Sequence, residues 1–239
     1  MSGHSKWAGI KHKKALIDAK RGSSFTKIAN MITVAAKQGG GDPNMNPGLR
    51  LAVEKARAAN MPKDNMERAI KRGTGELGGA AVEELLYEGF GPGNTAILVE
   101  ALSDNRNRTN ADVRMIFNKN GGRIPDGGGV AYQFTQKGVI RLDVPAAKTD
   151  AFEEAVIESG ADDYVLADGF GIIYVSPQTL HTVKDAIEAS GFPVESAKVE
   201  RVANTPIEID ETELEKVAKL LDLLDENDDV TNVYTNLAE

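Results

Sequence analysis

The chain has 239 residues, 41% of them hydrophobic, a formal net charge of −8 and no cysteine. The missing cysteines exclude a disulfide, a thiolate nucleophile and a cysteine–zinc site, and no apolar run approaches the roughly 18 residues that a membrane span needs. We therefore expect a cytoplasmic globular protein of two or three small domains, without a signal peptide or a membrane segment.

Charge is distributed unequally along the chain. Residues 1–75 carry 15 basic and 5 acidic side chains, a net charge of +10, whereas residues 76–239 carry 13 basic and 31 acidic side chains, a net charge of −18. A basic module attached to an acidic body is typical of proteins whose basic part binds a polyanion.

The first 22 residues predict a mobile arm, because glycines interrupt them and large apolar side chains are few. Trp7 offers a ring for stacking on a base, and His12 adds a hydrogen-bond donor. Six further basic side chains suit phosphate contact: Lys6, Lys11, Lys13, Lys14, Lys20 and Arg21. The alternative is a solvated basic tail with Trp7 packed against the body.

Three helices follow the arm in the predicted order. The first begins at Ser23 or Ser24, either of which can cap it, and ends near Gln38; the second begins at Pro47, and the third covers 63–72. Apolar residues at helical spacing give each helix one inner face. The basic side chains that we predict to bind nucleic acid from these helices are Lys27, Arg50, Arg57, Arg68, Lys71 and Arg72.

The pattern then changes to the period of a strand. Strands are predicted at 81–88 and 95–102, followed by a helix that Thr109 caps and that runs up to Gly121. The remaining pieces of this part are strands 130–134 and 206–209, helix 211–224 and strand 230–235. From residue 95 onward these pieces spell the order βαββαβ, interrupted between 134 and 206.

The interrupting segment, residues 136–202, predicts the same order once more. Its strands are expected at 139–144, 164–167, 170–175 and 194–202, and its helices at 149–159 and 177–190. The order βαββαβ is typical of ferredoxin-like domains. The predicted fold class is therefore α+β, with an N-terminal three-helix domain (1–75) and two ferredoxin-like α/β domains. The third domain (136–202) is inserted into the second, which comprises 76–135 and 203–239.

The segment Asn105-Arg106-Asn107-Arg108 is a further candidate for nucleic-acid contact. It presents two guanidinium groups and two amides between a predicted strand and a predicted helix. The alternative is a helix-entry loop whose asparagines satisfy local backbone groups.

Motifs of enzymes and metal sites are not supported by their context. Residues 73–78 spell GxGxxG, but they follow a helix, whereas a dinucleotide site needs a preceding strand. The acidic run 225–229 imitates a calcium loop, yet Val230 stands where that loop needs glycine. His181 is isolated in a predicted helix. The sequence therefore predicts no catalytic residue, no metal site and no cofactor.

The acidic body has two interpretations. Its carboxylates, including the tail from Asp210 to Asp229, can repel nucleic acid and so orient the basic domain, or contact a basic partner such as the ribosome or RNA polymerase. The alternative is that they form ordinary solvated helix faces. On that interpretation they carry no function.

Several long motifs resemble the YebC/PmpR family, which includes the mitochondrial translational activator of cytochrome c oxidase. They are GHSKWAGIKHKK (3–14), DAKRG (18–22), TVAAKQGGGDP (33–43), LRLAVEKARAANMPKDNMERAIKRGTGE (49–76) and YEGFGPGNTAILVEALSDNRNRT (87–109). The chain departs from the family pattern at Gly9, at Ser23-Ser24 and at residues 123–126. The resemblance implies a helical first domain and two α/β domains, the third inserted in the second.

The resemblance also implies regulation of gene expression without catalysis, at one of two levels. Bacterial members are described as transcriptional regulators that bind promoter DNA, whereas the mitochondrial relatives look like ribosome-associated translation factors that act near the peptidyl transferase centre. Segments 3–14 and 18–27 are where either role places nucleic-acid contact. A helix with Arg68, Lys71 and Arg72 suits the major groove of DNA, but a glycine-rich arm with a tryptophan suits folded rRNA or tRNA. We put DNA first, translation second and a protein-interaction scaffold third.

Overall fold

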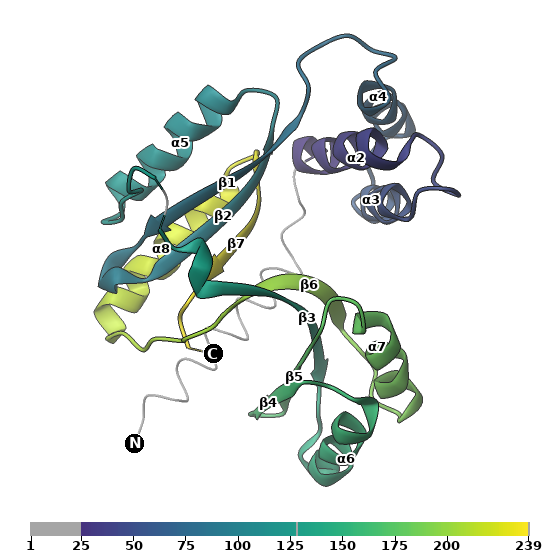
Figure 1. Ribbon diagram of the computed structural model, residues 1–239, viewed down its shortest axis with the longest axis vertical. Helices are drawn as coiled ribbons and strands as arrows, with labels where there is room; N and C mark the ends of the chain where they lie inside the picture. The colour runs from purple at the N-terminus through teal and green to yellow at the C-terminus, as the bar shows by residue number, and fades with distance from the viewer. Residues whose placement is uncertain (1–24, 128, 239) are drawn as a thin grey trace. The chain divides into compact units, whose positions relative to one another are not determined.

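The computed structural model describes residues 25–127 and 129–238 and shows a mixed α/β chain with two antiparallel sheets (Figure 1). The chain forms two compact units. The four-stranded unit is Tyr132–Pro206, and the larger unit comprises residues 25–131 together with Ile207–Ala238. The α+β class with a helical N-terminal part is confirmed, whereas the three-domain boundaries stay a prediction. Among residues 25–127 and 129–238, none of the helices has the length and the apolar composition of a membrane span.

The N-terminal part of the larger unit is helical, and we call it the helical domain. It consists of α2 (Phe25–Gly39), α3 (Pro47–Ala58) and α4 (Lys63–Gly73). The Asn46 side chain caps α3 by accepting a hydrogen bond from the Leu49 N–H at 3.0 Å. The three helices pack around buried side chains: Ile28, Ile32, Ala36, Leu49, Ala52, Val53, Ala56, Met61 and Ala69.

The closest approach of α2 and α4 requires glycine at residue 73. A Cβ atom built on Gly73 would lie 2.3 Å from the Thr33 carbonyl oxygen and 2.7 Å from the Ala36 Cβ. Both distances are far below van der Waals contact. Gly73 therefore sets how closely the two helices pack, in addition to ending α4.

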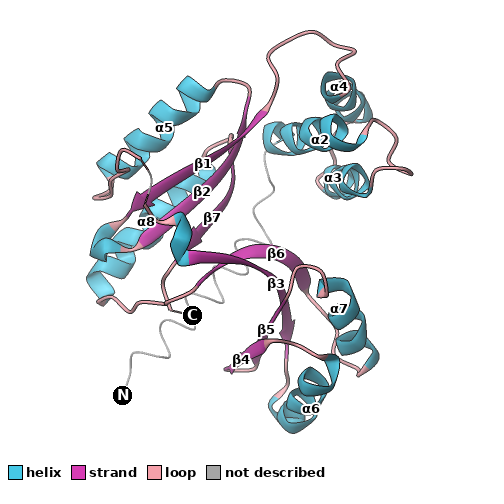
Figure 2. Ribbon diagram, viewed as in Figure 1, coloured by secondary structure: helices cyan, strands magenta, loops and turns pink. Residues whose placement is uncertain are grey.

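The second part of the larger unit is a three-stranded sheet covered by two helices (Figure 2). Its strands β1 (Glu83–Phe90), β2 (Ala96–Ser103) and β7 (Val230–Thr235) pair antiparallel in the order β1-β2-β7. Helices α5 (Arg106–Lys119) and α8 (Glu211–Glu226) pack on one face of β2. This core joins side chains of all three elements: Ile97, Val99, Ala101, Val113, Phe117, Leu220 and Leu224.

Two predicted strands of this part are wrong. Ala131–Gln133 is a 3-10 turn rather than strand 130–134, and the next strand, β3, begins at Phe134 and runs to Asp143. The segment 206–209 makes a single parallel bridge, between Ile207 and Leu237, rather than a strand. Pro206 lacks the N–H that a strand ladder uses. This sheet therefore has three strands instead of the five predicted for this part of the chain.

The predicted start of the helix that follows β2 is also wrong. Helix α5 begins at Arg106, and its cap is Asn105, whose side chain accepts from the Arg108 N–H at 3.1 Å. Thr109 lies one turn inside the helix and is fully buried. Residues 106–108 are therefore the first turn of α5 and not a loop.

The four-stranded unit confirms the order βαββαβ. After β3 come α6 (Thr149–Ser159), β4 (Asp163–Ala167), β5 (Phe170–Val175), α7 (Leu180–Ala189) and β6 (Ser196–Ala203). The sheet order is β4-β5-β3-β6, and every pair is antiparallel. Helix α7 begins three residues after the predicted Pro177. The core is formed by the helices and the alternate strand residues that face them, among them Ile140, Leu142, Phe152, Ile173, Val183 and Ile187.

Candidate nucleic-acid interface

Four of the exposed basic side chains on α3 and α4 are predicted nucleic-acid ligands. Arg50 and Arg57, seven residues apart, share one exposed face of α3, beside the buried Leu49 and Ala56. Arg68 and Lys71 are exposed on α4. Within residues 25–127 and 129–238, no carboxylate forms an ion pair with any of these four. Their donors are therefore available to phosphate; we call Arg50, Arg57, Arg68 and Lys71 the α3–α4 basic face.

Two predicted ligands in the helical domain have partners. The Lys27 amino group donates to the backbone carbonyl of Asp225 in α8. One terminal nitrogen of Arg72, Nη2, donates to Asp104 Oδ2 at 3.0 Å and to the Ala80 carbonyl at 2.9 Å. These two side chains join the helical domain to α8 and to the segments next to β1 and β2. Lys27 and Arg72 therefore differ from the four residues of the α3–α4 basic face, which have no such partners within the described residues.

The other two predicted nucleic-acid ligands, Arg106 and Arg108, lie in the first turn of α5 and differ in their contacts. Arg106 is exposed. Arg108 Nη2 donates to both carboxylate oxygens of Asp229, at 2.9 and 3.1 Å, and to Asp104 Oδ1 at 3.3 Å. The hydrogen bond and charge of Asp229 raise the pKa of Arg108. Arg108 therefore acts as a structural cation in this state.

Asp229 is the centre of a buried polar cluster that we did not predict. It is 5% exposed, and it accepts hydrogen bonds from Thr109 at 2.7 Å and Ser103 at 3.1 Å besides those from Arg108. The interpretation of the acidic run that ends at Asp229 as a solvated helix face is wrong for this residue. Three residues of β2 and α5 thus satisfy one carboxylate that lies more than 100 residues away in the chain. No local signal in the sequence identifies it.

Tyr87 lies beside this cluster. Its hydroxyl is buried and has no hydrogen-bond partner in the described part of the chain. Burial raises the pKa of Tyr87, the charge of Arg106 lowers it and that of Asp229 raises it. The hydroxyl therefore stays protonated at neutral pH.

The loop after α5 is held by Glu88 of β1. Glu88 Oε2 accepts three backbone N–H groups, those of Gly129, Val130 and Ala131, each at 2.8 Å. Partial burial raises the pKa of Glu88, but the three hydrogen bonds outweigh it and the net shift is downward. At the other end of the loop, the Arg123 guanidinium stacks 4.8 Å from the centre of the Phe90 ring. The three hydrogen bonds to Glu88 explain why residues 129–131 turn instead of continuing as a strand.

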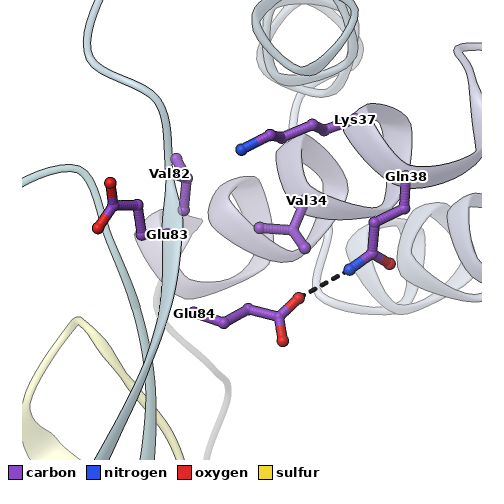
Figure 3. A pocket seen from close by; sticks show the side chains of 6 residues that line it. All are labelled: Val34, Lys37, Gln38, Val82, Glu83 and Glu84. Atoms are coloured by element: carbon purple, nitrogen blue, oxygen red, sulfur yellow. Dashed lines mark hydrogen bonds between the residues drawn. The ribbon is translucent and has the colours of Figure 1, made fainter.

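A shallow pocket of about 460 Å³ lies between the end of α2 and the start of β1 (Figure 3). Val34 and Val82 form its apolar part, and Lys37, Glu83 and Glu84 line it with opposite charges. The Gln38 side chain donates to Glu84 at 2.7 Å. Because the charges are mixed, this pocket does not extend the α3–α4 basic face.

The predicted ligands of the arm lie outside the described residues. They are Lys6, Trp7, Lys11, His12, Lys13, Lys14, Lys20 and Arg21. Their role in binding, and that of the described ligands, stays a prediction. Groups of three or more histidine or acidic side chains that could hold a metal ion do not occur among residues 25–127 and 129–238.

Two family models together match almost the whole chain. The model described as "TACO1/YebC protein N-terminal domain" matches residues 5–76, and "TACO1/YebC second and third domain" matches residues 82–237. The chain belongs to the TACO1/YebC family. The boundary between the two YebC models falls between α4 and β1, where the helical domain meets the first strand. The resemblance inferred from the motifs is confirmed.

Relatives in the YebC family match over their full length. A "Probable transcriptional regulatory protein" of Treponema denticola is 53% identical over 237 residues, covering 99% of this chain and 96% of the relative. A protein with the same description from Persephonella marina is 54% identical over 241 residues, covering 99% and 95%. The crystal structure of the conserved hypothetical protein Aq1575 from Aquifex aeolicus superposes with a TM-score of 0.77 at 43% identity, covering 93% of this chain and 92% of that chain.

Proposed function

We propose that this protein is a non-enzymatic, cytoplasmic regulator of gene expression that binds nucleic acid through its basic N-terminal domain. The observation that carries the proposal is the α3–α4 basic face, whose four cations have no acidic partner within the described ranges, in a module with a net charge of +10. Exposed, unpaired cations of this kind release counterions when they contact phosphate, which drives binding. The names of the curated relatives support a regulatory role.

Promoter DNA is the first target that we propose. Arg68 and Lys71 stand one turn apart on α4, so a helix in the major groove could present both to base edges or flanking phosphates. The relatives described as transcriptional regulators favour this target. The arm would then add phosphate contacts that do not depend on sequence.

Ribosomal RNA or tRNA is the second target, and specific observations favour it too. The family description joins YebC with TACO1, and the resemblance stated above includes a translational activator. The arm has the lone tryptophan of the chain among six basic residues, a composition suited to stacking and phosphate contact in folded RNA. RNA polymerase or the ribosome would be the larger partner in the two cases.

A salt series with matched double variants tests nucleic-acid binding. Affinity for a promoter duplex and for an rRNA fragment is measured between 50 and 300 mM salt. We expect Arg57→Ala with Arg68→Ala to reduce the slope of log K against log salt by about 2, because two phosphate contacts are lost. The control, Lys119→Ala with Lys219→Ala, changes the charge equally on exposed positions of α5 and α8 and should leave the slope near its wild-type value.

The outcome also separates the two targets. Sequence-selective binding of the duplex without ribosome association supports transcription, whereas RNase-sensitive cosedimentation with ribosomes supports translation. If neither nucleic acid binds with salt-dependent affinity, or if both double variants weaken binding equally, the proposal is wrong. A protein-interaction scaffold would then be the remaining explanation.

A further inference from the structure

One carboxylate bridges two arginines where the helical domain meets β2 and α5. Asp104, just after β2, accepts from Arg72 of α4 at 3.0 Å through Oδ2 and from Arg108 of α5 at 3.3 Å through Oδ1. The Arg72 side chain is 31% exposed and that of Asp104 36%. The hydrogen bond and the charge of Arg72 lower the pKa of Asp104, so its carboxylate is charged at neutral pH.

The two arginines differ in how firmly they are held. Arg108 also bonds both oxygens of Asp229, whose side chain is only 6% exposed, so losing Asp104 leaves Arg108 in place. In the part of the chain that the structure describes, Arg72 has no second carboxylate; its other bond goes to the backbone carbonyl of Ala80. An exchange of partners at Asp104 would therefore release Arg72 first.

Of the other donors across this boundary in residues 25–127 and 129–238, the uncharged Gln38 amide donates to the Glu84 carboxylate at 2.7 Å, whereas Asn30 and Lys27 donate to backbone carbonyls. Asn30 donates to the Leu102 carbonyl at 3.1 Å, and Lys27 donates to the Asp225 carbonyl. A guanidinium binds carboxylate and phosphate with the same planar set of donors. Asp104 thus occupies a position that a nucleic-acid phosphate can take.

We propose that Asp104 is a built-in competitor for nucleic-acid phosphate. A phosphate group that binds Arg72 displaces Asp104 and frees the helical domain from the corner formed by β2 and α5. This inference rests on the proposed function and adds Arg72 as a ligand that becomes available only when its ion pair opens. Nucleic-acid binding and the orientation of the helical domain are then coupled, each favouring the other.

The first test removes the charge of Asp104 and keeps its shape. Asp104→Asn should bind a mixed-sequence DNA duplex about 3- to 10-fold more tightly than wild type, with a salt slope steeper by about 1, because Arg72 gains a phosphate contact. The matched control is Glu67→Gln, which neutralises an exposed carboxylate paired with Lys63 in the same domain at 3.3 Å. It should change affinity by less than about 2-fold.

The second test reads the orientation directly. Because the chain has no cysteine, Met45→Cys and Lys119→Cys give two unique labelling positions, one in the helical domain and one at the end of α5. We expect the duplex to shift the label distance in the wild-type background. In the Asp104→Asn variant the label distance should already differ from that of wild type before duplex is added, whereas in the Glu67→Gln variant it should not. The wild-type arm of this test needs no change at Asp104, so it stays informative if that variant folds poorly.

The failures of the two proposals are distinguishable. If neither wild type nor Asp104→Asn binds the duplex or an RNA hairpin, the proposed function is wrong. If wild type binds, but Asp104→Asn binds no more tightly than Glu67→Gln or the duplex leaves the label distance unchanged, the competitor proposal alone is wrong.

Discussion

The α3–α4 basic face and the first turn of α5 both carry arginines, but they use them differently. On α3 and α4 the guanidiniums of Arg50, Arg57 and Arg68 are exposed and have no acidic partner within the described residues. At α5, Arg108 is bound by Asp229 and Asp104. An exposed cation contributes little to folding, whereas a cation that neutralises a buried carboxylate is part of the fold. The number of basic residues in a motif is therefore not the number of its cations that are left without an acidic partner.

The strongest test of this comparison is Asp229→Ala. It leaves Arg108, Thr109 and Ser103 without their shared acceptor, and we expect a loss of about 3–5 kcal/mol in the free energy of unfolding. Urea unfolding followed by circular dichroism measures it. The control is the exposed neighbour Asp228→Ala, for which we expect a change within about 0.5 kcal/mol. Equal effects of the two variants would show that the buried cluster is not structural.

The next largest effect is expected at Gly73, beneath the α3–α4 basic face. Replacing glycine by alanine in a helix usually stabilises it, but at Gly73 the new methyl group would clash with the Thr33 carbonyl. We expect Gly73→Ala to cost about 1–3 kcal/mol in the free energy of unfolding, measured by the same method. At Gly78 a Cβ meets nothing within 4 Å, so Gly78→Ala should cost less than about 0.5 kcal/mol. A gain in stability at Gly73 would contradict the close packing of α2 and α4.

Local patterns predicted the parts of the fold that local interactions decide. Helix α3 follows from Pro47 and apolar spacing and begins at the predicted residue, and the bounds of α4 lie within one residue of the predicted 63–72. The βαββαβ order of the four-stranded unit follows from alternating strands and helical periods. The exposed cations of α3 and α4 follow from the same helical spacing, since the positions opposite a buried stripe face solvent.

Contacts distant in sequence decided the parts that were predicted wrongly. Thr109 and Asn105 are both good cap residues, but Thr109 is buried because it bonds Asp229, 120 residues later. Residues 130–134 alternate like a strand, yet Glu88, more than 40 residues earlier, accepts the N–H groups that a ladder would use. The Asp104 partner of Arg72 and the Asp229 partner of Arg108 are hidden for the same reason, since they lie 32 and 121 residues away. No short window contains both members of these two pairs, although Arg108 also pairs with Asp104 four residues before it.

The Glu88 contact predicts a smaller effect that depends on pH. Since the pKa of Glu88 is lowered in the folded state, its contribution to stability is complete above the ordinary value of 4.5 and is lost as pH falls through the lowered value. At pH 7 we expect Glu88→Gln to cost about 1 kcal/mol, because a neutral amide oxygen accepts the three N–H groups less strongly. The difference from wild type should shrink when urea unfolding is repeated at pH 4 and pH 3. Glu83→Gln, an exposed glutamate of the same strand, should show no such trend.

The smallest effect on stability is expected on the α3–α4 basic face itself. Because Arg68 is exposed and has no acidic partner among residues 25–127 and 129–238, Arg68→Ala should change the free energy of unfolding by less than about 0.5 kcal/mol. On the proposed function, the same variant should reduce the salt slope of nucleic-acid binding by about 1. Arg108→Ala should do the reverse, destabilising the fold because Asp229 is left buried and unpaired. If Arg68→Ala destabilised the fold as much as Arg108→Ala, the distinction between binding and structural arginines would be wrong, because both would then act through the folded state.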